Sequence, residues 1–128
     1  MKLFVDEDTG SGLARALRAV GVDADYVGTR RAIRPGTPDE IWLPRAGREN
    51  RLVFSRNTGI LSAEAQRKLV ILHRVGLVFL PQHLSALALL RLVLSRWGRL
   101  EAIYDAEPKP FAKFLTANGR VLARSLSE

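Results

Sequence analysis

The amino-acid sequence predicts an α/β fold with a mostly parallel central sheet, helices on both faces and a C-terminal β-hairpin. Short apolar runs of strand length alternate with helix-like segments over residues 1–97, which implies right-handed βαβ crossovers. Near the C-terminus an Asn-Gly pair separates two strand-like runs, a pattern typical of a hairpin. Since the chain has 128 residues and no low-complexity segment, we expect residues 1–128 to form a single domain.

The four parallel strands are expected where apolar, β-branched and aromatic residues form short runs between turn residues. These runs are residues 2–5, 23–27, 51–55 and 77–80. A helix with apolar residues at helical spacing is expected between the first two strands, over residues 13–20. The next helix should begin with Thr37 as N-cap and Pro38 at the first helical position, with Glu40 completing a capping box. Ser62 is expected to cap the helix after that.

The C-terminal third should contain one long helix and the hairpin. Residues 85–97 are strongly apolar on nearly every side and end at Gly98, so we expect this helix to be buried against the sheet or against a second copy in a homodimer. The hairpin should join residues 111–116 to residues 120–123 through a type I′ turn at Asn118-Gly119.

The positive charge is concentrated in the middle of the chain. The net charge is +7, and it divides into −2 for residues 1–27, +6 for residues 28–74 and +3 for residues 75–128. Arg30, Arg31 and Arg34 lie in a Gly- and Pro-containing segment that we interpret as an exposed loop. A basic surface beside an acidic one suits a protein that binds a phosphate backbone, and RNA is the expected partner. A solvated basic surface without a ligand is the alternative that charge alone leaves open.

Several classes of protein are disfavoured by composition. Cysteine is absent, so disulfides and thiolate zinc sites are excluded, and a cytoplasmic location is expected. The N-terminal apolar run is too short for a signal peptide, and residues 84–94 are too few to span a bilayer, so we expect no membrane association. The chain also lacks a P-loop and a dinucleotide-binding fingerprint, which argues against a nucleotide cofactor.

Acidic and amide side chains gather where parallel strands are expected to end, which is where open α/β sheets bind ligands. They lie in three segments, Asp6-Glu7-Asp8, Asp39-Glu40 and Ser55-Arg56-Asn57. Clustered carboxylates repel one another unless a cation is present, and oxygen ligands suit Mg²⁺ or Mn²⁺. Such an ion can activate water against a phosphodiester. The alternatives are a solvated acidic turn after the first strand and, for the second segment, acids favoured by the helix dipole.

The histidines and tryptophans are interpreted as structural. His73 and His83 have no carboxylate or second histidine at ligand spacing. Trp42 and Trp97 lie among leucines and are expected in the core or an interface.

The order of these motifs resembles the PIN-like nuclease domains, and within them the VapC45-type group of bacterial toxins. The motifs that carry the resemblance are Leu3–Asp8, Leu13–Leu17, Thr37–Pro44, Leu52–Asn57, Gly76–Leu80, the Leu-rich helix ending at Trp97, and Pro110-Phe111. The resemblance implies a metal-dependent endoribonuclease that uses Mg²⁺ or Mn²⁺ and acts as the toxin of a toxin–antitoxin pair, with a cognate antitoxin protein as partner.

Carried over by position, the resemblance implies that the catalytic residues are Asp6, Glu40 and Asn57, with Asp39 as a substitute for Glu40. The metal would be held by Asp6, Asp39 and Glu40, and Asp8 is a further expected ligand. Asn57 departs from the family pattern, because an aspartate is usual there and an amide brings no charge to a cation.

The residues expected to bind RNA phosphates share a positive charge and proximity to these acids. They are Arg30, Arg31, Arg34 and Arg56. The competing hypothesis, motivated by Asn57, is a PIN-like module that binds RNA or a protein without cleaving. A receiver-like signalling domain is disfavoured, because Asn57 cannot serve as its phosphorylated aspartate.

Overall fold

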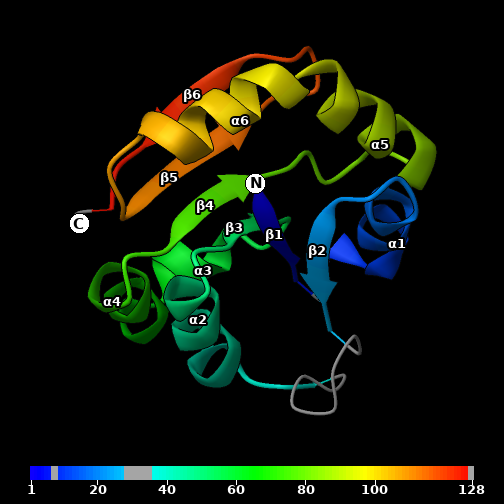
Figure 1. The fold of residues 1–128 in the computed structure, drawn as a ribbon. Helices are drawn as coiled ribbons and strands as arrows, with labels where there is room; N and C mark the ends of the chain where they lie inside the picture. The colour runs from blue at the N-terminus through cyan, green and yellow to red at the C-terminus, as the bar shows by residue number, and fades with distance from the viewer. Residues whose placement is uncertain (7–8, 28–35, 127–128) are drawn as a thin grey trace.

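The fold is a six-stranded sheet between two layers of helices (Figure 1), seen in a computed structural model that describes residues 1–6, 9–27 and 36–126. The strands share lengths of four or five residues and are β1 (Lys2–Val5), β2 (Asp23–Tyr26), β3 (Leu52–Ser55), β4 (Gly76–Phe79), β5 (Phe111–Leu115) and β6 (Val121–Arg124). The helices are α1 (Ser11–Ala19), α2 (Asp39–Arg48), α3 (Gly59–Ser62), α4 (Glu64–Leu72), α5 (Ala86–Ser95) and α6 (Trp97–Ala106).

The strand order is β2-β1-β3-β4-β5-β6. All neighbouring pairs are parallel except β5 with β6, which form the antiparallel C-terminal hairpin. The predicted fold class is therefore confirmed. Because β2 lies on one side of β1 and β3 lies on the other, the chain changes direction across the sheet at β1 and β3, and this junction is where an open sheet binds ligands.

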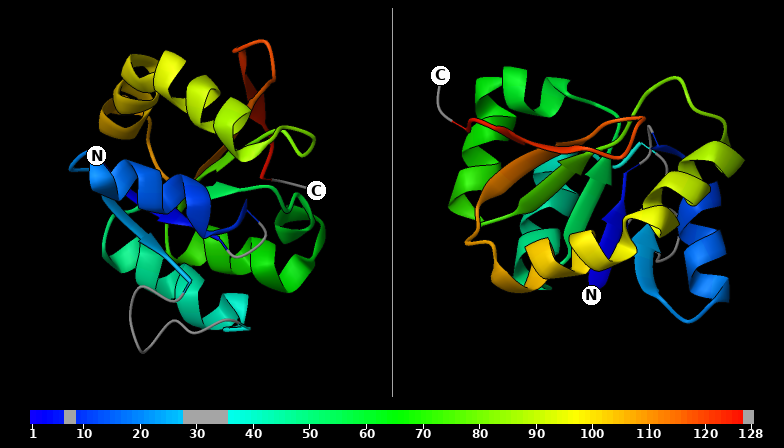
Figure 2. Two further views of the ribbon diagram at one scale, coloured as in Figure 1. Left: turned by 90° about the vertical axis from the view of Figure 1, so that its right-hand side faces the viewer. Right: turned by 90° about the horizontal axis from the view of Figure 1, so that it is seen from above.

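Each face of the sheet has its own apolar core, because side chains alternate between the faces along every strand. Helices α1, α5 and α6 cover one face, and α2, α3 and α4 cover the other (Figure 2). Leu3 and Val5 belong to the first core, whereas Phe4 belongs to the second. In the second core the indole of Trp42 stacks on Phe4 with ring centroids 4.8 Å apart, so the expectation that Trp42 is a core residue is confirmed.

Two close approaches in this framework require glycine. A Cβ on Gly76 would lie 2.6 Å from Cζ of Phe111, so the first residue of β4 must lack a side chain for the ring to cross it. A Cβ on Gly47 would lie 2.2 Å from the backbone oxygen of His73, which is how closely α2 packs on the end of α4. Helix α2 accordingly continues through Gly47 to Arg48.

The predicted start of α2 was wrong. Pro38, with an extended ψ of 153°, is the N-cap, the helix begins at Asp39, and no side chain caps it. The capping box of Thr37 and Glu40 is absent because Pro38 lies outside the helix and its carbonyl receives the amide of Ile41, at 3.0 Å. Ser62 likewise does not cap the next long helix, since Ser62 ends α3 and Ala63 is the N-cap of α4.

The prediction of a single long C-terminal helix was also wrong. The chain leaves helical geometry at Arg96 (φ −115°, ψ 17°), so α5 and α6 are separate and Gly98 lies inside α6. The Arg96 guanidinium holds this corner by donating from Nε to the backbone oxygen of Gly119, at 2.7 Å. Helix α5 is not buried all round either, because Leu87 is 59% exposed and Leu94 is 49% exposed.

The hairpin is present, but its turn is not type I′. Thr116 accepts the amide of Gly119 at 2.9 Å and pairs its own amide with the oxygen of Arg120 at 2.8 Å. Gly119 has a φ of 87°, and Asn118 does not have a positive φ. These features define a three-residue loop in which Gly119 takes the left-handed position that type I′ would also have required of Asn118.

Candidate functional site

The candidate site lies at the carboxyl ends of β1 and β3, where the direction of the sheet changes. The amide of Asp6 donates to the oxygen of Phe54 at 3.1 Å, so Asp6 continues the ladder one residue beyond β1. On the other side of β3, the amide of Leu80 donates to the oxygen of Ser55 at 2.9 Å. Residues from three neighbouring strands are thus fixed at one edge.

Among the described acids at this edge, Asp6 is the most buried, with 4% of its surface exposed. Thr9 donates twice to Oδ1 of Asp6, from its amide at 3.0 Å and from its hydroxyl at 2.7 Å. The hydroxyl of Ser55 donates to Oδ2. A buried carboxylate costs free energy unless it is hydrogen-bonded, so these three donors explain why Asp6 is tolerated here and fix its orientation.

Ser55 and Asn57 extend the network along the loop after β3. Ser55 is fully buried, and its hydroxyl accepts the amide of Asn57 at 2.9 Å while donating to Asp6. The side-chain oxygen of Asn57 accepts the amide of Gly59 at 3.0 Å, which begins α3. In this conformation the Asn57 amide oxygen therefore stabilises the turn into α3.

The acids of α2 lie at the same edge, because α2 returns from the carboxyl end of β2 to the amino end of β3. Glu40 is exposed in the first turn. Asp39 is half-buried and accepts the indole N–H of Trp42 at 3.0 Å. Asp39 therefore fixes a core tryptophan, whereas the Glu40 carboxylate faces solvent.

The donor chemistry at the edge suits a hard divalent cation, since Asp6, Ser55 and Asn57 offer oxygen atoms and no sulfur. Among the residues that the structure describes, no group of three or more His, Cys, Asp and Glu side chains could hold a metal ion. A metal here would thus be held by fewer of these side chains or by residues outside the described ranges. Asp8 is one of the residues outside them.

Arg56 binds the segment after β4 to the site. Its Nη2 donates to the oxygen of Leu84 at 3.3 Å, and Gln82 donates from Nε2 to the backbone oxygen of Arg56 at 2.9 Å. The Nε of Arg56 is buried and has no hydrogen-bond partner among the described residues. The other expected phosphate-binding residues, Arg30, Arg31 and Arg34, lie outside the described residues.

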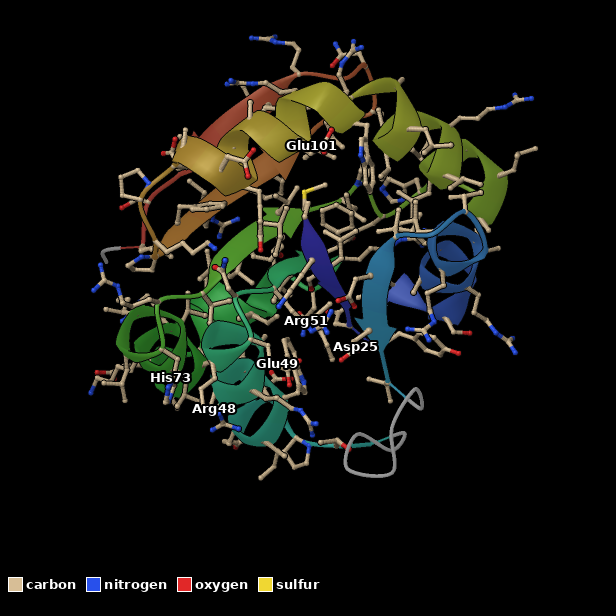
Figure 3. The ribbon with its side chains drawn as sticks, in the orientation of Figure 1. Asp25, Arg48, Glu49, Arg51, His73 and Glu101 are labelled. Carbon is tan, nitrogen blue, oxygen red and sulfur yellow. The ribbon has the colours of Figure 1, made fainter. Side chains whose placement is uncertain are left out.

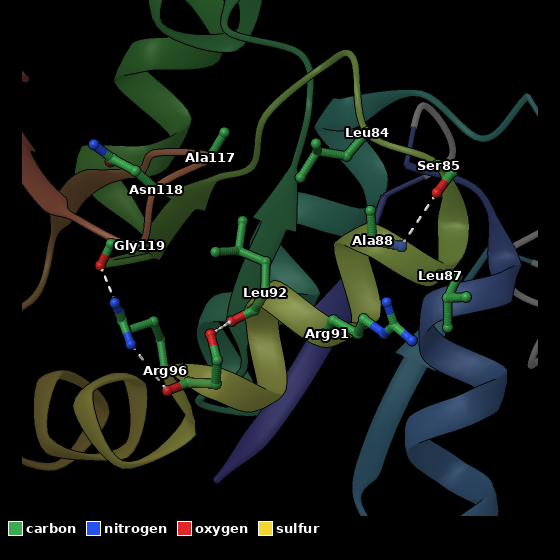
Figure 4. A pocket seen from close by; sticks show the side chains of 11 residues that line it. Leu84, Ser85, Leu87, Ala88, Arg91, Leu92, Arg96, Ala117, Asn118 and Gly119 are labelled. Atoms are coloured by element: carbon green, nitrogen blue, oxygen red, sulfur yellow. Dashed lines mark hydrogen bonds between the residues drawn. The ribbon is translucent and has the colours of Figure 1, made fainter.

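Two cavities flank the hairpin turn beside this edge. The smaller, of about 280 Å³, lies between the loop after β3, the end of β4 and the end of β5. The larger, of about 460 Å³, lies between α5 and the hairpin turn (Figure 4), where Arg96 reaches Gly119. Ala117 lines both cavities.

A second polar cluster lies at the opposite edge of the sheet and is structural. Arg51 is 6% exposed and lies between Glu49 and Asp25 (Figure 3), with ion pairs of 2.8 Å to Glu49, 2.9 Å to Asp23 and 3.4 Å to Asp25. It also donates to the backbone oxygen of Leu3 at 3.0 Å. Burial lowers the pKa of Arg51, but the hydrogen bonds to Glu49 and Asp23 and the charges of Asp25 and Asp23 outweigh it, so the pKa is raised overall. Arg51 therefore stays charged and joins α2 to β1 and β2.

Sequence reasoning identified Asp6 but missed Thr9 and Ser55 as its partners. Thr9 follows Asp6 by three residues, a spacing at which a side-chain oxygen commonly accepts from a nearby amide or hydroxyl. Ser55 is the polar end of an otherwise apolar strand. Both signals were available, although neither identifies its partner without the fold.

A mostly parallel sheet with a buried carboxylate at its change of direction defines an open α/β module whose candidate ligand-binding edge contains Asp6. A family model described as "PIN like domain" matches residues 1–82, from β1 to just beyond β4. The chain belongs to the family of PIN-like domains, and the predicted resemblance is confirmed at this level. No curated protein and no solved structure matches the chain. Within the described residues, none of the helices combines the length and apolar character needed to cross a membrane.

Proposed function

We propose that residues 1–128 form one PIN-like domain that cleaves RNA with Mg²⁺ or Mn²⁺, as the cytoplasmic toxin of a VapC45-type toxin–antitoxin pair. The observation that carries the proposal is Asp6, a carboxylate buried at the change of direction of the sheet and oriented by Ser55 and Thr9. Membership of the PIN-like family supports a nuclease-type activity.

The chain's own residues have distinct proposed roles. Asp6 is the principal metal ligand, Asp8 and Glu40 complete the ligand set, and Asp39 takes a secondary place because it already accepts from Trp42. When bound, the metal would supply an activated water and neutralise charge developing on the phosphate. Ser55 and Thr9 are proposed as positioning residues, because they donate hydrogen bonds to the Asp6 oxygens.

The proposed phosphate-binding residues are basic side chains near this edge. They are Arg30, Arg31, Arg34 and Arg56. For Arg56, a partly exposed position directly after Ser55 supports this role, since a phosphate oxygen can accept from a guanidinium.

The decisive experiment measures cleavage of a labelled random-sequence RNA by purified protein with Mn²⁺, with Mg²⁺ and with EDTA. We expect metal-dependent cutting that Asp6→Asn lowers at least about 100-fold, because a lost metal ligand costs several kcal/mol of transition-state stabilisation. Asp105→Asn, an exposed acid on α6, is the matched control and should cut like the wild type. RNA left intact with both ions, or unchanged cutting by Asp6→Asn, would refute the proposal.

A second candidate function, RNA or protein binding without cleavage, is favoured by Asn57. Its amide oxygen accepts from Gly59, and an aspartate of the same shape could keep this bond while adding charge. If the site has lost activity, Asn57→Asp should gain cleavage, and wild-type RNA binding should persist in EDTA and weaken steeply with salt. Full activity of the wild type would eliminate this candidate.

The proposed partners other than RNA are a cognate antitoxin protein and a second copy of the chain. Their support is the resemblance to the VapC45-type group, together with the apolar side chains Leu87 and Leu94 exposed on α5. A solution molecular mass equal to one chain across the micromolar range would exclude the homodimer.

A further inference from the structure

We propose that the 280 Å³ cavity between the β3 loop and the hairpin is a nucleobase-binding pocket that sets the base preference of RNA cleavage at Asp6. This inference rests on the proposed function, because it places a base of the same RNA strand beside the reacting phosphate. The pocket lies near the site: its lining comes mainly from the ends of β4 and β5, which are two and three strands from β1. At about 4.8 Å per strand this is about 10–14 Å from Asp6, within reach of a nearby nucleotide.

The walls of the pocket are hydrogen-bonded to Ser55, which holds Asp6, and to Arg56, the next residue along the chain. Leu80 donates its amide to Ser55, and Gln82 donates to the backbone of Arg56. Arg56 in turn donates to Leu84. The segment from Leu80 to Leu84 is thus held at its start, middle and end. The pocket is therefore preformed, and its position relative to the candidate site is fixed.

The lining has the chemistry that recognises a base. Leu80 and Leu115, which are buried, and Phe114 supply the apolar part of the lining. Thr58 and His83 add a hydroxyl and an imidazole, which can pair with the edge of a base or, for the ring, stack on its face. Ligand pockets usually begin at about 300 Å³, so this one suits a single base.

The larger cavity is a weaker candidate for this role. Its lining residues belong to α5, the segment before it and the hairpin turn, and none of them belongs to the loop after β3. Arg96, one of the two arginines in its lining, is already hydrogen-bonded to Gly119.

The first test titrates ¹⁵N-labelled protein with AMP, GMP, CMP and UMP in EDTA. We expect one nucleotide to shift the amides of Thr58, Gln82 and His83 more than the others do. Ala117→Trp should fill the pocket and weaken this binding about 10- to 100-fold, since stacking of a base is worth that factor. Ala102→Trp, an exposed alanine on α6, is the control. Shifts confined to other residues, or unchanged binding by Ala117→Trp, would overturn the proposal.

The second test maps the ends of products from a random RNA pool. Wild-type protein should show a base preference that Ala117→Trp removes while cutting continues to depend on Asp6. The second variant is His83→Ala, which introduces no large side chain. We expect it to reduce the base preference less than Ala117→Trp does. If a nucleotide changes the amide chemical shifts at the pocket but the protein cleaves no RNA, the proposed nuclease activity is refuted and base binding by the pocket is not. Cleavage without base preference and without pocket shifts would refute the pocket alone.

Discussion

Replacing Ser55 by alanine should weaken both the fold and the proposed activity, because Ser55 joins Asp6 to the β3 loop. The variant loses a hydrogen bond to a buried carboxylate, worth about 1.5–3 kcal/mol, and an acceptor for the Asn57 amide, worth about 1 kcal/mol. Allowing for partial relaxation, we expect the free energy of unfolding to fall by about 2–3 kcal/mol. This is a large part of the roughly 5–15 kcal/mol that stabilises a typical domain.

Urea unfolding measures this loss directly, as a lower midpoint with an unchanged slope. Ser95→Ala is the matched control, since that hydroxyl donates to Leu92 on the exposed side of α5, and it should stay within about 0.5 kcal/mol of wild type. Cleavage by the folded Ser55→Ala protein should fall about 10- to 100-fold, as for other residues that orient a metal ligand. If the free energy of unfolding of Ser55→Ala lies within about 0.5 kcal/mol of wild type, the Asp6–Ser55 hydrogen bond does not contribute net stability.

Three further predictions concern the framework. Arg51→Met should lower the free energy of unfolding by about 3–5 kcal/mol, because it removes a buried cation that is paired with Asp25, Asp23 and Glu49; thermal melting checks this, and a loss below about 1 kcal/mol would contradict it. Gly76→Ala should cost about 1–3 kcal/mol, because the new Cβ would press on Phe111; an unchanged urea midpoint would show that the ring moves freely. The hydrogen bond and charge of Lys68 lower the pKa of Glu64 below its ordinary value of 4.5, so the stability that Glu64 contributes is present above pH 4.5 and lost as pH falls through the lowered pKa. Glu64→Gln should therefore show a shallower loss of stability on acidification, and identical acid titrations would contradict this.

Most strands of the sheet were predictable from the sequence, because they are short apolar runs bounded by turn residues. The runs ending at Asp6 and at Ser55 each stop at a polar residue, and parallel crossovers must bring those ends to one edge. The position of Asp6 could therefore be predicted before its contacts were known.

The remaining features depend on contacts between segments far apart in sequence. The break at Arg96 depends on a bond to Gly119, 23 residues later, and local hydrophobicity cannot show it. The donors that surround Asp6 include Ser55, 49 residues away. The predicted start of α2 was wrong for a local reason. A Thr-Pro pair followed by two acids is compatible with an N-cap at either Thr37 or Pro38.

Asp6 is proposed to anchor a divalent cation, and anomalous diffraction from crystals soaked in Mn²⁺ tests this proposal. We expect a peak in contact with the Asp6 carboxylate, and this peak should disappear in Asp6→Asn crystals. A peak elsewhere, or none at Asp6 in wild-type crystals, would contradict it.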